Sequence, residues 1–294
     1  MSGISDHVQA CFLNACRLDV AVRKPGNVSV VSPGHRMHAD LFIASAQAAA
    51  LPLCEPGARV GARIEAAMAA TWASVGCNTN LGILLLCAPL AAAAERPGAL
   101  GDAVALRDAV QAVLEDLDRD DARAAYRAIA LAHPGGLGDA TEQDVRDEPS
   151  LDLRAAMALA ADRDNIARQY ANGFAELFDI ALPPLLNRGF PLMASADTDA
   201  VDASIVGLVQ RLYIELLSRL PDSHIVRKHG EAVAHIVMRA AQAWRGRESF
   251  DRDPDFAAWD AQLKADGINP GTSADFTVAA LFAAGLLEVR RTAA

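Results

Sequence analysis

The chain has 294 residues, of which 52% are hydrophobic and 22% are charged, so it can bury a large core and is not a disordered protein. Its net charge of −10 argues against a nucleic-acid-binding surface, which requires clustered basic residues. The charge does not argue against phosphorylated small molecules, because a few local arginines and lysines are enough to bind them.

The cysteines and the apolar segments indicate the cellular compartment of the protein. The five cysteines form no Cys-x-x-Cys pair and their number is odd, which favours free thiols in a reducing compartment. The N-terminus has no basic-then-apolar signal pattern. The longest apolar run, 81–94, is too short to span a bilayer and contains Pro89. We therefore expect a cytoplasmic protein that interacts with neither nucleic acid nor membrane.

Apolar residues recur at helical spacing along nearly the whole chain. The expected helices cover 5–23, 41–53, 64–75, 81–94, 102–117, 120–132, 152–161, 164–182, 197–219, 231–245, 254–265 and 275–289. No segment shows the period of two that is typical of a half-buried strand. The sequence predicts an all-α protein in which residues 1–294 form a single compact domain of about ten to twelve helices.

The stretch 64–82 joins an alanine-rich helix to a polar turn. Glu65 is a carboxylate on an otherwise apolar helix, so it must be exposed, paired or bound to a ligand. Asn78, Thr79 and Asn80 follow in the turn, and a second apolar helix begins at once. Polar groups between two apolar helices are costly unless they find partners, so we expect a ligand at this turn.

Four turns combine Gly or Pro with polar side chains, at 24–28, 76–82, 222–230 and 269–275. The exposed backbone amides of glycine-rich turns and of helix N-termini favour anions. Arg227 and Lys228 add positive charge to the third turn. An ordinary solvated loop is the alternative for each turn taken alone.

The common catalytic motifs are absent from the sequence. It contains no P-loop, dinucleotide-binding glycine motif, HExxH or GxSxG. Two loops offer metal ligands, one with His35, His38 and Asp40 and the other with Asp144 and Asp147. A solvated loop remains the alternative for both.

Taken in order, the polar segments make the chain similar to the triphosphoribosyl-dephospho-CoA synthase family. The matching segments span nearly the whole chain: Arg23-Lys24-Pro25-Gly26-Asn27-Val28; Glu65 with Met68 and Thr71; Asn78-Thr79 with Gly82; Pro221-Asp222-Ser223-His224-Ile225 with Arg227 and Gly230; and Asn269-Pro270-Gly271-Thr272-Ser273-Ala274-Asp275. The resemblance implies an all-α transferase of prosthetic-group precursor synthesis. Such an enzyme moves the 5-triphosphoribosyl group of ATP onto the 2′-hydroxyl of 3′-dephospho-CoA and releases adenine.

The reaction that the resemblance implies breaks an N-glycosidic bond through a cationic sugar, so it needs carboxylates, proton-transfer groups and cations for the triphosphate. We expect catalytic roles for three acidic residues of the matching segments, Glu65, Asp222 and Asp275. We expect nucleotide or phosphate binding by Lys24, Gly26, Asn27, Asn78, Thr79, Arg227, Gly271 and Ser273. The expected cofactor is Mg²⁺, with ATP as substrate and Glu65 and Asp222 as its protein contacts.

The chain departs from the family after Thr79, where members acting on dephospho-CoA have His and Lys and this chain has Asn80 and Leu81. The loop 134–138 is similar to an archaeal-type branch, whose organisms often make methanopterin-type one-carbon coenzymes. A ribitol hydroxyl is therefore the alternative acceptor. Hydrolysis by water and a non-catalytic helical scaffold are further alternatives. The sequence leaves the oligomeric state open, with a homodimer as one option.

Overall fold

The computed structural model describes residues 2–134, 143–188, 191–193, 201–247, 250 and 252–288. Within these ranges the chain forms fourteen α-helices and one π-helical segment, with no strand. The predicted all-α class is confirmed, and the helices are slightly more numerous than expected. None of the described helices is long and apolar enough to cross a membrane. Most of the 134–138 loop lies outside the described residues.

The helices follow one another with short connections over most of the chain. The first group comprises α1 (Ser2–Ala21), α2 (Ala39–Leu53), α3 (Val60–Val75), α4 (Leu81–Ala94), α5 (Ala103–Glu115) and α6 (Arg119–Ala132). The middle group comprises α7 (Leu153–Ala158), α8 (Asn165–Asn172), the π-helical η1 (Leu177–Ala181) and α9 (Leu182–Leu186). The last group comprises α10 (Ala203–Arg219), α11 (Ser223–His229), α12 (Glu231–Gln242), α13 (Pro254–Ala265) and α14 (Gly271–Leu286).

Aspartate side chains begin seven of the described helices. They accept hydrogen bonds from first-turn backbone amides of α5, α6, α7, α8, α10, α11 and α13, and they are Asp102, Asp118, Asp152, Asp164, Asp202, Asp222 and Asp253. Such caps satisfy amide donors that a helix start leaves open, and the negative charge suits the positive end of the helix dipole.

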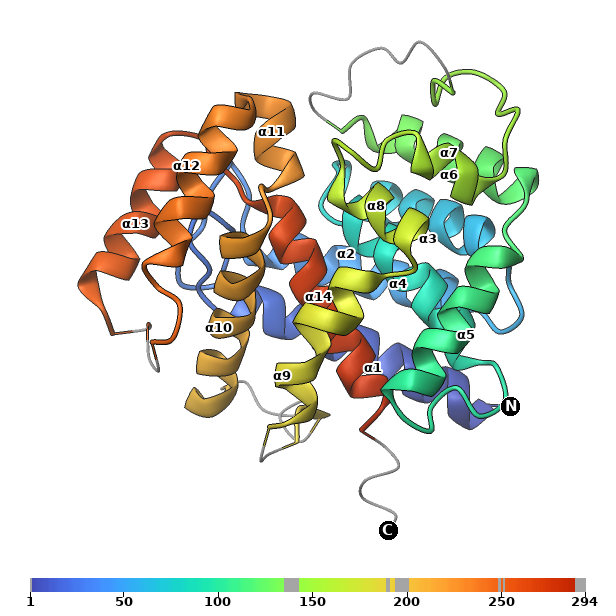
Figure 1. The fold of residues 1–294 in the computed structure, drawn as a ribbon, viewed down its shortest axis with the longest axis horizontal. Coiled ribbons are helices and arrows are strands. Elements are labelled where there is room, and N and C mark those ends of the chain that lie inside the picture. Colours follow the sequence, from blue (N-terminus) through green and yellow to red (C-terminus); the bar gives the residue numbers. More distant parts are fainter. Residues whose placement is uncertain are drawn as a thin grey trace.

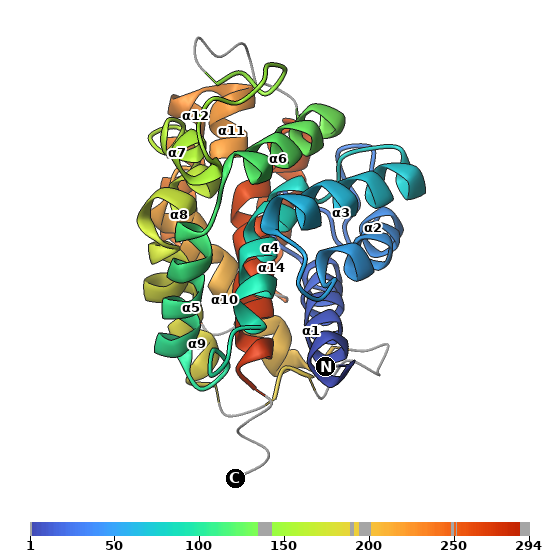
Figure 2. The ribbon, with the colours of Figure 1, turned by 90° about the vertical axis from the view of Figure 1, so that its right-hand side faces the viewer.

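Helix α14 is the central element of the fold. It runs through the middle of the molecule and packs against α1, α4 and α10 (Figures 1 and 2). Every residue from 272 to 286 is buried except Asp275, which is half-buried. A helix that is apolar on all sides belongs in a core, so the single carboxylate is the feature of α14 that packing alone does not explain.

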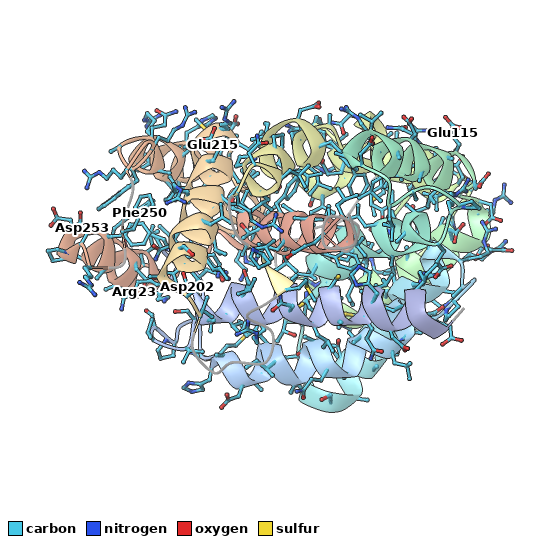
Figure 3. All side chains as sticks on the ribbon, turned by 90° about the horizontal axis from the view of Figure 1, so that it is seen from below. Arg23, Glu115, Asp202, Glu215, Phe250 and Asp253 are labelled. Atoms are coloured by element: carbon cyan, nitrogen blue, oxygen red, sulfur yellow. The ribbon has the colours of Figure 1, made fainter. Side chains whose placement is uncertain are left out.

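Two hydrophobic cores meet along α10 and α14. The larger core gathers side chains from α1 to α6 and most of α14, and the smaller core lies among α10, α11, α12 and α13. Phe250 belongs to the smaller core, and Figure 3 shows it at the opposite end of the molecule from Glu115. Because α10 and α14 contribute to both cores, the structure offers no obvious division, and the single domain stays a prediction.

Three expected elements differ from the sequence-based interpretation. The predicted turn 269–275 is helical from Gly271 on, because α14 begins there and not at Asp275. The segment 222–230, interpreted above as a polar turn, is the short helix α11, which begins after Asp222 and ends at Gly230 with φ +86°. The interpretation as a turn is therefore wrong. The helix escaped notice because seven residues are too few to show an apolar period. The expected helix 164–182 is divided, because α8 ends at Gly173, where φ is +73°.

Candidate functional site

A cleft of about 770 Å³ lies where several helix ends meet. It is lined by the C-terminal ends of α3 and α6, by the N-terminal ends of α4, α8 and α14, and by α7 and α11. In Figure 1, α11 lies on one side of the start of α14, and α3 and α6 lie on the other. Small-molecule sites typically occupy about 300–1,000 Å³, so the cleft has the size of a ligand site.

The polar turn between α3 and α4 forms part of the cleft wall, but most of its polar groups bind within the protein. Asn78 Oδ1 accepts a hydrogen bond from the first backbone amide of α4 at 3.1 Å. Thr79 Oγ1 donates to Ser45 Oγ at 2.6 Å, and Asn80 Nδ2 donates to Thr71 Oγ1 at 3.0 Å. Within the described residues, Asn80 Oδ1 is buried without a partner. The sequence predicts a ligand that satisfies the polar groups of this turn. Among the side-chain atoms described above, only Asn80 Oδ1 still lacks a partner.

Asp275 lies in the first turns of α14 and lines the cleft. It makes no hydrogen bond or ion pair within the part of the chain that the structure describes. Its carboxylate packs on Gly82, where an added methyl group would overlap Oδ2. Burial raises the pKa of Asp275 well above its usual value, and the negative charges of Asp19 and Asp222 raise it further. This carboxyl therefore holds its proton more tightly than an exposed aspartate does.

Asp222 lies behind the cleft wall, where both of its oxygens are occupied. Oδ1 accepts hydrogen bonds from the amides of His224 and Ile225 at 2.9 and 3.2 Å. Oδ2 accepts from the amide and the hydroxyl of Ser273 at 2.7 and 2.9 Å. Burial raises the pKa of Asp222, and the hydrogen bonds from Ser273 oppose that rise. Asp222 and Ser273 thus join the starts of α11 and α14 and do not line the cleft.

Helix α11 brings an arginine and a lysine to the cleft. Arg227 Nη1 donates to Asp164 Oδ2 at 2.7 Å, while its Nε is buried without a partner among the described residues. Lys228 also lines the cleft and is exposed. These two cations give the α11 side of the cleft its positive charge.

His224 lies between α11 and the start of α14. Its Nδ1 would be 2.8 Å from a methyl group added at Gly271, so glycine there lets the imidazole approach the backbone. Burial lowers the pKa of His224 to about 3, and the charges of Lys228 and Arg227 contribute. The imidazole is therefore neutral at physiological pH. Its Nε2 is buried without a partner in the described chain.

Lys24 is fully buried and does not line the cleft. Its Nζ lies 3.1 Å from Asp19 Oδ1 and also donates to the Asp19 backbone carbonyl. Burial raises the pKa of Asp19, and the charge of Lys24 opposes that rise. The structure therefore places the lysine beneath the cleft, where it neutralises a carboxylate.

Gly26 and Asn27 lie in the loop after α1. Gly26 has φ +79°, and a methyl group on it would lie 2.7 Å from Pro270 Cδ. Only a residue without a side chain fits there, so the loop packs closely against the turn before α14. Asn27 lines the cleft, and its Nδ2 donates to Asn269 Oδ1 at 3.1 Å.

Glu65 lies on the surface of α3 that contacts α6. Its two oxygens accept hydrogen bonds from Arg127 Nε and Nη2 at 2.6 and 2.7 Å, and both side chains are substantially exposed. Glu65 is not part of the cleft wall. Of the predicted site residues, the structure brings together at the cleft Asn27, Asn78, Thr79, Arg227, Gly271 and Asp275.

The predicted magnesium contacts do not come together. Glu65 is paired with Arg127, and the oxygens of Asp222 are used by backbone and hydroxyl groups. The described residues contain no group of three His, Cys, Asp or Glu side chains that could hold a metal ion. Mg²⁺ that arrives on a nucleotide needs only one or two carboxylates besides the phosphates, and Asp275 is available for that.

Sequence reasoning missed the roles of Asp164 and Asp19 and the pairing of Trp72 with His133. Asp164 carries a helix-start signal, but nothing in the sequence indicates that its second oxygen meets Arg227, 63 residues away. Trp72 and His133 lie at the ends of two helices that only the folded chain brings together. Their ring centroids are 6.1 Å apart.

Together the fold and the cleft define an all-helical protein with a ligand-sized cleft that has two cationic side chains on one side. The sequence model of the ATP:dephospho-CoA triphosphoribosyl transferase family matches residues 5–293, and the chain belongs to that family. This match confirms the family suggested by the motifs, and with it a transferase that acts on ATP and dephospho-CoA.

A solved structure has a similar fold. It is a crystal structure from Archaeoglobus fulgidus, described as that of a candidate triphosphoribosyl-dephospho-CoA synthase. The similarity has a TM-score of 0.64 at 24% sequence identity and covers 84% of this chain and 99% of that one. At this identity it concerns the fold alone. No curated protein matches the chain.

Proposed function

We propose that the chain forms a bond between C1′ of the ATP ribose and the 2′-hydroxyl of 3′-dephospho-CoA, releasing adenine. The family match supports the two substrates. One observation supports the position of the chemistry, namely a carboxyl group, Asp275, that lines the cleft and has no partner among the described residues.

Asp275 is the proposed general base. The acceptor oxygen bonds to C1′ while the C1′–N9 bond breaks, and the electron pair of that bond leaves with adenine. Asp275 accepts the hydroxyl proton, and the departing adenine takes up one proton from water, so that Asp275 returns its proton to water and the reaction balances. A carboxylate with a raised pKa is a stronger base near neutral pH, and its negative charge also stabilises a cationic sugar.

The triphosphate is placed on the α11 side of the cleft. Arg227 and Lys228 supply cations there. Mg²⁺ is proposed to enter as part of the ATP substrate, bound mainly by its phosphates. Asn27, Asn78 and Thr79 are proposed to hydrogen-bond to ribose or base.

The assay is the release of adenine from ATP, measured with and without dephospho-CoA. Transfer predicts adenine only when the acceptor is present, whereas hydrolysis predicts adenine in its absence. The Asp275→Asn variant should lower turnover by about a hundredfold or more, the size typical for a proton-transfer group. If adenine is released with an arylamine-ribitol acceptor and not with dephospho-CoA, the acceptor is the ribitol hydroxyl of the alternative hypothesis. A cytoplasmic location and a homodimer stay predictions.

A further inference from the structure

Trp72 and His133 form an aromatic pair in the cleft wall, on the α3 and α6 side. Their ring centroids lie 6.1 Å apart and their planes are inclined by 33°. Both residues line the cleft, as do the neighbouring Tyr126 and Ile129. The other two tryptophans stack on each other in the smaller core, away from the cleft. One side of the cleft is thus aromatic and apolar, while the α11 side is cationic.

The backbone of His133 adds a second observation. It forms the C-cap of α6 in the left-handed region, with φ 45° and ψ 54°. Glycine or asparagine is usual at such a position, because other side chains are strained there. The imidazole is also fixed, since Nδ1 binds the Leu131 carbonyl at 2.8 Å. Histidine stands where glycine is usual, and its ring lies beside that of Trp72, which points to a use beyond ending the helix.

We propose that Trp72 and His133 bind an adenine ring, which stacks on the pair and leaves its phosphates directed toward α11. The two rings are already at contact distance, so the base extends the stack and does not enter between them. Stacking recognises the flat face of any base, while the cations of Arg227 and Lys228 recognise the phosphates. The inference rests on the proposed function for its ligand, because both ATP and dephospho-CoA carry adenine.

Calorimetric titration of the full chain tests the stack without requiring turnover. The ligands are adenosine, ATP, dephospho-CoA and inorganic tripolyphosphate. In His133→Gly, adenosine affinity should fall by about tenfold, which corresponds to about 1.4 kcal/mol, while tripolyphosphate affinity stays unchanged. Glycine relieves the backbone strain at this position, so the variant should unfold at the same temperature as the wild type or higher. Trp72→Ala should weaken adenosine binding similarly.

Tryptophan fluorescence locates the base. Adenosine should quench the wild-type emission and should fail to change that of Trp72→Phe, which retains an aromatic face. Trp259→Phe is the matched control, because Trp259 lies outside the cleft lining, and its quenching should be that of the wild type. Whichever of ATP and dephospho-CoA loses affinity in His133→Gly is the source of the adenine.

Unchanged adenosine affinity in both His133→Gly and Trp72→Ala would overturn the proposal, as would an equal loss of tripolyphosphate affinity. Failure of the proposed function looks different. It would leave the wild type without adenine release while the adenosine titrations still show the loss in His133→Gly.

Discussion

Arg227 Nη1 lies 2.7 Å from Asp164 Oδ2, and this ion pair joins α11 to the start of α8 beside the cleft. The other oxygen of Asp164 accepts hydrogen bonds from the Ile166 and Ala167 amides at 2.8 and 3.2 Å. One carboxylate therefore begins a helix and also fixes the direction of a cation proposed to bind phosphate. Both side chains are about one quarter exposed, at 23% and 26%, so water screens the pair.

The first prediction separates these two tasks of Asp164. Asp164→Asn keeps a good N-cap but loses the charge, so the free energy of unfolding should fall by less than about 1 kcal/mol. The KM for ATP should rise by roughly three- to tenfold, because Arg227 is no longer held in place for the phosphates. Asp164→Ala should show the same KM and a further loss of about 1 kcal/mol in stability. Steady-state kinetics measures the KM for ATP, and urea denaturation measures the free energy of unfolding. An unchanged KM in Asp164→Asn would show that Asp164 does not position Arg227.

The second prediction concerns the pH dependence of stability through Asp275. Its pKa is raised above the ordinary value of 3.8. A carboxyl whose pKa is higher in the folded chain than in the unfolded one stabilises the fold fully below pH 3.8, and this stabilisation is lost as the pH rises through the folded value. Asparagine resembles the protonated form. Asp275→Asn should therefore be more stable than the wild type at pH 7 and equal to it near pH 3.5, although it is nearly inactive.

Asp222→Asn is the matched control for that prediction. The pKa of Asp222 is also raised by burial, but its four hydrogen bonds need two accepting oxygens. An amide offers one accepting oxygen, so two donors from Ser273 or the start of α11 lose their partner. This variant should be destabilised by about 1–3 kcal/mol. Thermal unfolding from pH 3.5 to 8 compares the unfolding temperatures of Asp275→Asn and Asp222→Asn with that of the wild type. A change of the same sign in both variants at pH 7 would contradict the prediction.

Much of the fold could be predicted from local sequence, and the site only in part. Helix α4 begins and ends where expected, because an unbroken apolar run lies between the polar turn and Pro97. Asp275 stands out as a lone carboxylate in an apolar segment, so the sequence could indicate it. The partner of Lys24 or of Glu65 depends on how helices pack, and no local pattern carries that information. Sequence spacing therefore found residues of the right chemistry but could not separate those in the cleft from those behind it.

The third prediction tests the buried position of Lys24. Lys24→Met leaves the Asp19 carboxylate buried without its cation, which typically costs about 3–5 kcal/mol. The free energy of unfolding should fall by that amount, while the folded fraction should retain its KM for ATP. Lys228→Met is the control, because Lys228 is exposed at the cleft, so it should keep the stability and raise the KM. A raised KM with unchanged stability in Lys24→Met would support the phosphate-binding role that the sequence predicts.

The fourth prediction uses the close packing between Gly82 and Asp275. A methyl group at position 82 would overlap Asp275 Oδ2 and would lie 2.8 Å from Ile166 Cδ1. The carboxyl group is the closer of the two neighbours, so Gly82→Ala should displace it and reduce turnover by at least about tenfold. Stability should change by less than about 1 kcal/mol, because alanine favours the helix. Gly3→Ala, a helical position with open space, should leave both unchanged. Full activity of Gly82→Ala would show that the exact position of Asp275 does not matter.

The fifth prediction decides between two roles of Glu65. Its place in the family motif predicts that Glu65→Gln lowers turnover by orders of magnitude. Its position predicts otherwise, because Glu65 is 36% exposed and Arg127 59% exposed in an ion pair outside the cleft wall. We expect turnover within about twofold of the wild type and a loss of stability below about 1 kcal/mol, as is usual for exposed pairs. Arg127→Gln breaks the same pair from the other side and should behave alike. If Glu65→Gln is inactive and Arg127→Gln is active, the carboxylate acts on the substrate in a conformation other than the one described, and Glu65 regains its catalytic role.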